Sequence, residues 1–136
     1  MTLHRTEMTA SVNSVSRIVS WAEGAGRQYP DLTNTSINAM LVCIHELVCN
    51  IALHSKRPDG APTVKVSLQI DATGIAVGIE DNGQPFDPVK QAPINIETDL
   101  ASADLGGRGL RIVHEMAREL SYARADQWNR VRLEIA

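Results

Sequence analysis

The sequence is poor in cysteine: its 136 residues include only Cys43 and Cys49, and both lie in an apolar stretch. Two cysteines cannot build the disulfide framework that small secreted domains use. A free thiol inside an apolar helix behaves as a small hydrophobic side chain, which fits a reducing compartment. The scarcity of cysteine therefore excludes the disulfide-rich class and favours a cytoplasmic protein.

The sequence also lacks an excess of positive charge and a signal for export. Its 16 acidic and 13 basic residues are spread along the chain and give a net charge of -3, without the basic block of a nucleic-acid binder. No apolar run approaches the roughly 20 residues that a membrane-spanning helix needs. The first residues, Met1 to Arg5, are not followed by the apolar core of a signal peptide. We therefore expect no direct nucleic-acid partner and no membrane.

The chain does contain enough apolar side chains, 43% of its residues, for one packed core, and we expect one domain over residues 1–136. After a polar, strand-like start at Thr2 to Thr9, apolar spacings of three and four predict a helix from about Ser11 to Gln28. A second helix should begin near Thr33 or Asn34, which are good capping residues, and continue to His54. This second helix is apolar on most sides and should be central.

Alternation of apolar and polar residues predicts two antiparallel hairpins, the first with a tight turn at Asp71 to Gly74. The four predicted strands are 64–70, 75–79, 122–125 and 131–135. Periodicity is absent from Asp81 to Leu105, which we interpret as a functional loop, and helical spacing then runs from Leu110 to Leu120. This order of elements predicts an α+β fold, a two-layer sandwich with helices on one face of a mainly antiparallel sheet.

Three short segments carry the candidate chemistry, and the first lies on the predicted central helix. Glu46, Asn50 and His54 are spaced by four residues and form one polar stripe. The side chains of Glu46 and Asn50 either satisfy each other or face solvent, or the stripe faces a cavity. In a cavity, Asn50 can bind Mg²⁺ through its amide oxygen and Glu46 can accept a proton.

The dipeptide His45-Glu46 also resembles the start of a zinc-protease helix. That motif needs a second histidine where this chain has Cys49. Cys43, His45 and Cys49 fit no standard zinc spacing either, so we set the metalloprotease interpretation aside.

The second segment, Asp81-Asn82-Gly83, follows a predicted strand. These residue types are those of an ordinary turn. A carboxylate at a strand end can also accept a hydrogen bond from an exocyclic amine such as that of adenine, and Gly83 would let a base lie close to the backbone. Asp81 is therefore the candidate for nucleotide specificity.

The third segment is Gly106-Gly107-Arg108-Gly109-Leu110, at the start of a predicted helix. Glycines at a helix N-terminus expose backbone amides that bind phosphate, although three glycines also make an ordinary flexible start. Arg108 either pairs with phosphate oxygens or lies in solvent. The segment is neither a P-loop nor a dinucleotide-binding fingerprint, because no Gly-Lys-Ser/Thr follows it and no strand leads directly into it.

Taken in order, these segments resemble the three nucleotide-binding boxes of the GHKL ATPase superfamily. The matching residues are Glu46-x-x-x-Asn50-x-x-x-His54, Asp81-x-Gly83-x-Pro85-Phe86-Asp87-Pro88, Gly106-Gly107-x-Gly109-Leu110 and Asn129-Arg130-Val131-x-Leu133. Within the superfamily, the sequence is similar to the small anti-sigma factor serine kinases of bacterial partner-switching systems. The resemblance implies the Bergerat ATP-binding fold over nearly the whole chain.

The resemblance also implies roles for the matching residues. Asp81 would contact adenine, Asn50 would bind Mg²⁺, and the turn from Gly106 to Leu110 would hold the phosphates of ATP beneath a mobile loop. Glu46 would be the general base toward a serine hydroxyl. His54, Gly83 and Arg108 count among the nucleotide-binding candidates for the same reason.

The partners that the resemblance implies are an anti-sigma factor antagonist, as the protein substrate, and a sigma factor that the protein sequesters. A homodimer through the first strand and the first helix is a further expectation of this kind. Two alternatives stay open at this point: a nucleotide-gated binding regulator without kinase turnover, and a structural domain in which the motifs are coincidental.

Overall fold

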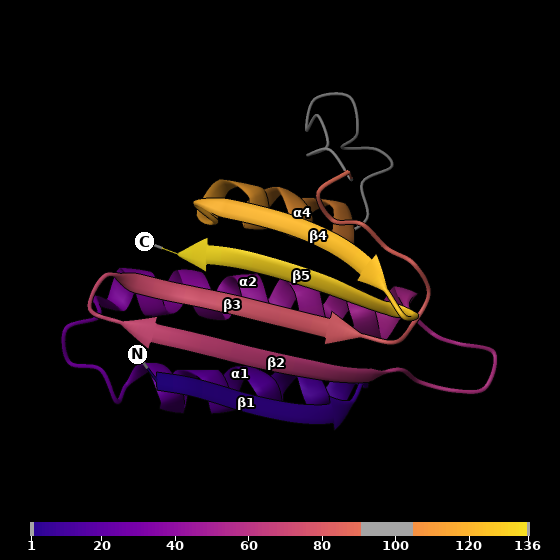
Figure 1. The fold of residues 1–136 in the computed structure, drawn as a ribbon, viewed down its shortest axis with the longest axis horizontal. Coiled ribbons are helices and arrows are strands. Elements are labelled where there is room, and N and C mark those ends of the chain that lie inside the picture. The colour runs from indigo at the N-terminus through magenta and orange to yellow at the C-terminus, as the bar shows by residue number, and fades with distance from the viewer. Residues whose placement is uncertain (1, 91–104, 136) are drawn as a thin grey trace.

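The computed structural model describes residues 2–90 and 105–135 and is drawn in Figure 1. In chain order the elements are β1 (Thr2–Thr9), α1 (Val12–Gly26), α2 (Asn34–His54), β2 (Thr63–Asp71), β3 (Gly74–Asp81), α4 (Leu105–Met116), β4 (Glu119–Ala125) and β5 (Trp128–Ile135). Most of the loop predicted between Asp81 and Leu105 falls on residues 91–104, which lie outside the described part.

The strands form one five-stranded sheet in the order β1-β2-β3-β5-β4, and all four neighbouring pairs are antiparallel. Both predicted hairpins are confirmed. In the turn between β2 and β3, the side chain of Asp71 accepts the backbone N–H of Thr73 at 2.8 Å. Asp126 and Gln127 between β4 and β5 have positive φ angles of 55° and 68°, the conformation that suits a two-residue hairpin turn.

The described helices cover one face of this sheet, so the predicted two-layer α+β sandwich is confirmed (Figure 1). In β2 and β3, every second side chain is buried against the helices, because side chains alternate between the two faces of a strand. The largest fully buried side chains that make this core are Ile18, Met40, Ile44, Leu68, Ile70, Ile79 and Leu133.

Helix α2 is the central helix, as predicted, and packs against both α1 and α4 as well as β3. Thr33 caps it: the Thr33 side chain accepts the backbone N–H of Ser36 at 3.0 Å. With 21 residues, α2 is long and apolar enough, by length and composition alone, to span a membrane. This corrects the expectation that no stretch of the sequence is apolar enough. The apolar side chains of α2 are used instead for packing, and Met40, Ile44 and Val48 are completely buried.

Three predicted boundaries need correction. Helix α1 ends at Gly26 rather than near Gln28. Helix α4 begins at Leu105, where the sequence predicts the end of the loop, so the glycines lie inside its first turns. Leu120, predicted to be helical, lies in β4, because the N–H of Arg118 already donates to the carbonyl of Glu134 at 2.7 Å and turns the chain into the sheet.

Candidate nucleotide site

The site lies where the C-terminal half of α2, the end of β3 and the start of α4 meet. Glu46 is partly buried on α2, and its Oε2 points at the backbone of Gly109 on α4. A Cβ atom on Gly109 would overlap Oε2 of Glu46. The missing side chain therefore lets α4 approach α2 and brings the first and third predicted segments together.

Asn50 lies one turn after Glu46 and is 4% exposed. Among the described residues, its Nδ2 has no hydrogen-bond partner. An unpaired buried amide costs about 1–3 kcal/mol, so this position suits a ligand. Since the nitrogen and oxygen of an amide exchange places by a flip, the same position can present Oδ1 to a cation. Glu46 and Asn50 therefore do not simply satisfy each other.

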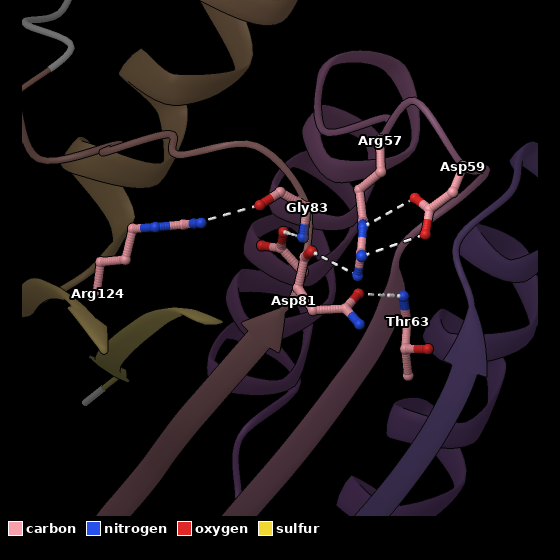
Figure 2. Close-up of polar contacts among 7 residues, drawn as sticks. Arg57, Asp59, Thr63, Asp81, Gly83 and Arg124 are labelled. Atoms are coloured by element: carbon pink, nitrogen blue, oxygen red, sulfur yellow. Dashed lines mark hydrogen bonds and ion pairs between the residues drawn. The ribbon is translucent and has the colours of Figure 1, made fainter. Parts of the chain in front are cut away.

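Asp81 ends β3 and is buried, with 4% of its surface exposed. Its Oδ1 accepts the backbone N–H of Gly83 at 2.9 Å, drawn in Figure 2, and the Nδ2 of Asn129 at 3.1 Å. In the described part of the chain, both of these hydrogen bonds go to Oδ1, which leaves Oδ2 to accept from a ligand.

The electrostatic environment of Asp81 is dominated by burial. Desolvation raises the pKa of the Asp81 carboxyl above its ordinary value, while hydrogen bonds from Asn129 and Gly83 and the charge of Arg124 oppose the rise. The carboxylate is thus held in a dry position, where a hydrogen-bond donor on a ligand is worth more than in water.

Gly83 makes the turn possible, because a Cβ atom on it would overlap the carbonyl oxygen of Ser55. Ser55 is the C-cap residue of α2 and is buried. Its carbonyl also accepts the N–H of Gln84 at 3.3 Å. The end of α2 and the Asp81-Gly83 turn are therefore in direct contact, which unites the first and second predicted segments.

Sequence reasoning assigned no role to Asn129, although it is the centre of the hydrogen-bond network around Asp81. Asn129 is 1% exposed, and its Nδ2 donates both to Asp81 and to the carbonyl of Gln84 at 2.8 Å. Its Oδ1 accepts the hydroxyl of Tyr122 at 2.5 Å and Nη1 of Arg124 at 2.9 Å. The partner of Asp81 across the β3–β5 ladder is Asn129, a register that a single sequence does not reveal.

Two arginines flank the Asp81-Gly83 turn (Figure 2). On one side, Nη1 of Arg124 donates to the carbonyl of Gly83 at 3.2 Å. On the other, Nη1 of Arg57 lies 3.5 Å from the carbonyl of Asn82, and its guanidinium is paired with Asp59 at 3.1 Å. The Asn82 side chain accepts the N–H of Thr63 at 2.7 Å, which fixes the turn to the start of β2.

The sequence profile of the histidine kinase-like ATPase domain matches residues 8–135, which is nearly the whole chain. The chain belongs to the histidine kinase-like ATPase domain family. This membership implies that the domain binds ATP and places it in the kinase and ATPase class.

One curated relative of this histidine kinase-like ATPase domain is the serine/threonine-protein kinase BtrW of Bordetella bronchiseptica, 30% identical over 94 residues. That match covers 69% of this chain and 66% of BtrW. The fold is similar to the RsbU and RsbW domains of a Mycobacterium tuberculosis protein, with a TM-score of 0.69, 12% identity, and coverage of 99% of this chain and 32% of that one. A blue-light activated histidine kinase of Erythrobacter litoralis matches with a TM-score of 0.51, 18% identity, and coverage of 94% and 42%.

The remaining predicted residues of this ATPase domain are placed as follows. Gly106 and Gly107 lie in the first turn of α4 together with Arg108, whose side chain is outside the described part. Leu110 is 5% exposed and packs in the core. His54 is the last residue of α2 and is exposed, so its role toward ATP stays a prediction.

The two cysteines and His45 do not form a metal centre. Cys43 is buried in the core and His45 is exposed, so they lie on different sides of α2. In the described ranges, no group of three or more His, Cys, Asp or Glu side chains could hold a metal ion. Burial, and then the charge of Glu46, raise the pKa of the Cys43 thiol to about 11, so it stays protonated at neutral pH.

Proposed function

We propose that this chain is an ATP-dependent protein serine kinase that phosphorylates a small anti-sigma factor antagonist and sequesters a sigma factor. The observation that carries the proposal is the carboxylate of Glu46, held at the junction of α2 and the glycine-containing start of α4. The resemblance to a relative named as a serine/threonine-protein kinase supports it. A homodimer through β1 and α1, and a location in the cytoplasm, belong to the same proposal.

In the proposed complex, ATP would be held by groups from three elements. Oδ2 of Asp81, which accepts no hydrogen bond from the described residues, would accept one from the exocyclic amine of adenine, beside the bare backbone of Gly83. The first amides of a helix lack partners within the helix, so those at the start of α4 would bind phosphate oxygens.

Asn50 would hold Mg²⁺, because an amide oxygen is a suitable ligand for this hard cation and Asn50 has an unpartnered buried amide. When bound, Mg²⁺ neutralises charge on the phosphates during phosphoryl transfer.

Glu46 would act on the acceptor. Its carboxylate would accept the proton of the serine hydroxyl as the serine oxygen forms its bond to the γ-phosphorus and the bond to the oxygen that bridges to ADP breaks. The products are ADP and phosphoserine, and the proton then leaves Glu46 for solvent. Glu46 is partly exposed, which gives the acceptor access to it.

The proposal is tested by incubating the purified protein with γ-labelled ATP, Mg²⁺ and small antagonist proteins of its own organism. We expect labelled phosphoserine on one antagonist. ATP binding without transfer to any antagonist would contradict the kinase and leave a nucleotide-gated binding regulator. No ATP binding would remove both functions.

We expect the substitution Gly109→Ala to slow phosphotransfer at least about tenfold without unfolding the protein. The new Cβ would overlap Oε2 of Glu46 and displace the carboxylate, whereas alanine is favoured over glycine in a helix by about 1 kcal/mol. The matched control is Gly24→Ala on α1, where a Cβ would meet nothing within 4 Å. A wild-type transfer rate in Gly109→Ala would show that the position of Glu46 against α4 does not matter.

A further inference from the structure

A groove of about 450 Å³ runs between α1 and α2, on the outer side of these two helices. Most of its lining is apolar and comes from Val12, Val15, Val19, Cys49, Ala52 and Leu53. Among the described residues, no aspartate, glutamate, lysine or arginine lines it. The groove therefore favours an apolar group, which can be buried there without desolvating a charged side chain of the lining.

Because α1 and α2 run antiparallel, the start of α1 lies beside the end of α2, and this end of the groove, away from His45, carries exposed apolar side chains. Val12, in the first turn of α1, is 76% exposed, and Leu53, in the last turn of α2, is 60% exposed. Neither side chain is needed to fill the core, since both point mostly to water. Exposed apolar side chains that border an apolar groove are typical of a surface that binds another protein.

The groove leads directly to the candidate general base. His45 lines it, and Nδ1 of His45 lies 3.5 Å from Oε1 of Glu46. Sγ of Cys49, in the lining of the groove, lies 3.9 Å from Nε2 of His45. The imidazole of His45 therefore contacts both the lining of the groove and the carboxylate that would receive the serine proton.

We propose that this groove binds an apolar side chain of the acceptor protein, close in sequence to the acceptor serine. An extended chain advances about 3.3 Å per residue, so a serine at Glu46 and a side chain beyond His45 are roughly two or three residues apart. The inference rests on the proposed kinase function, because it needs a serine hydroxyl at Glu46. It adds what that function leaves open, namely which residues beside the serine are recognised.

The test is a kinase variant that carries Val12→Asp and Leu53→Lys. Each new charge suits the dipole at its own helix end, so both helices should persist. We expect the KM for the acceptor protein to rise at least about tenfold, the factor that corresponds to losing the burial of one large apolar side chain. The kcat at saturating acceptor and the affinity for ATP should stay unchanged. The control is Met116→Lys in the last turn of α4, an exposed apolar residue outside the groove and outside the proposed dimer surface.

A double-mutant cycle checks that the two surfaces meet. Replacing the apolar residue nearest the acceptor serine by aspartate should raise the KM for the wild-type kinase but have little further effect on the groove variant. An unchanged KM in the groove variant, with normal transfer by the wild type, would overturn this inference and leave the kinase function standing. A shift from dimer to monomer with an unchanged KM would also overturn it and make the groove a self-association surface. No transfer by the wild type would instead contradict the kinase function.

Discussion

Replacing Asp81 with asparagine is expected to weaken ATP binding by about 100-fold or more while the protein stays folded. The asparagine carbonyl can still accept from Gly83 and Asn129 in place of Oδ1, so the turn keeps its internal hydrogen bonds. Its amide nitrogen then takes the place of Oδ2 and meets the adenine amine, donor against donor. Losing a hydrogen bond to a charged group and leaving a buried donor unpaired costs about 3–6 kcal/mol together. Calorimetry with ATP and Mg²⁺ measures this loss.

The free energy of unfolding of Asp81→Asn gives an independent check, because the direction of its pH dependence relative to the wild type is defined in advance. Because burial raises the pKa of Asp81 in the folded state, the folded protein binds the Asp81 proton more tightly than the unfolded chain does. Wild-type stability relative to the variant is therefore highest below the ordinary pKa of aspartate and falls as the pH rises through the folded pKa. At neutral pH, Asp81→Asn should be at least as stable as the wild type in urea.

The matched control for Asp81→Asn is Asp71→Asn, in the turn between β2 and β3. Asp71 is only partly buried, and its hydrogen bond from Thr73 lowers its pKa, the opposite direction to Asp81. The control should bind ATP normally. Wild-type affinity in Asp81→Asn would remove the assignment of Asp81 to adenine.

The substitution Glu46→Gln is expected to lower the rate of phosphotransfer by about 10²- to 10⁴-fold, the contribution typical of a general base. Glutamine has nearly the same shape as glutamate but cannot take the serine proton. ATP affinity should change little, since the groups assigned to adenine and Mg²⁺ remain. Single-turnover transfer of labelled phosphate to the antagonist measures the rate, and Glu23→Gln on the exposed side of α1 is the control.

A second measurement, the pKa of the Cys49 thiol, shows whether the Glu46→Gln variant is folded and lacks the negative charge at position 46. Glu46 contributes to raising the pKa of both Cys43 and Cys49, after burial, which is the larger cause. In Glu46→Gln the pKa of the partly exposed Cys49 should therefore fall toward its ordinary value, and its alkylation by iodoacetamide should begin at lower pH. Lower thiol pKa values together with undiminished phosphotransfer would rule out Glu46 as the base.

Much of the fold could be predicted from local patterns in the sequence. The alternation of apolar and polar residues in β2 and β3 predicts one buried face for each strand and hence the hairpin. Thr33, a good capping residue, predicts the start of α2. The glycines were placed at the start of a helix, but helical spacing is visible only from Leu110, because glycine disfavours a helix interior and yet the helix includes Gly106, Gly107 and Gly109. Leu120 fits both a helical and an alternating spacing, and its pairing with Leu133 of β5 decides for the strand.

The site could be predicted only as far as its motifs are local. The four-residue spacing of Glu46 and Asn50 places them on one side of α2. The position of Asp81 at the end of a predicted strand made it a candidate for binding a nucleotide. The contribution of Asn129 depends on the pairing of β3 with β5, and the contact of Gly83 with Ser55 depends on the docking of α2 on the sheet. Both contacts join residues that are far apart in the chain, so no short stretch of the sequence predicts them.

The hydrogen bond from Asn129 to Asp81 joins residues 48 positions apart in the chain. The carboxylate assigned to adenine therefore has both of its hydrogen bonds, the local one from Gly83 and the distant one from Asn129, only when β5 is already paired in the sheet. Nucleotide affinity thus depends on the pairing of β5 with β3 as well as on the Asp81-Gly83 turn. By the same linkage, bound ATP would oppose the detachment of β5 and would protect a strand that lies far from Glu46 and Asn50 in the sequence.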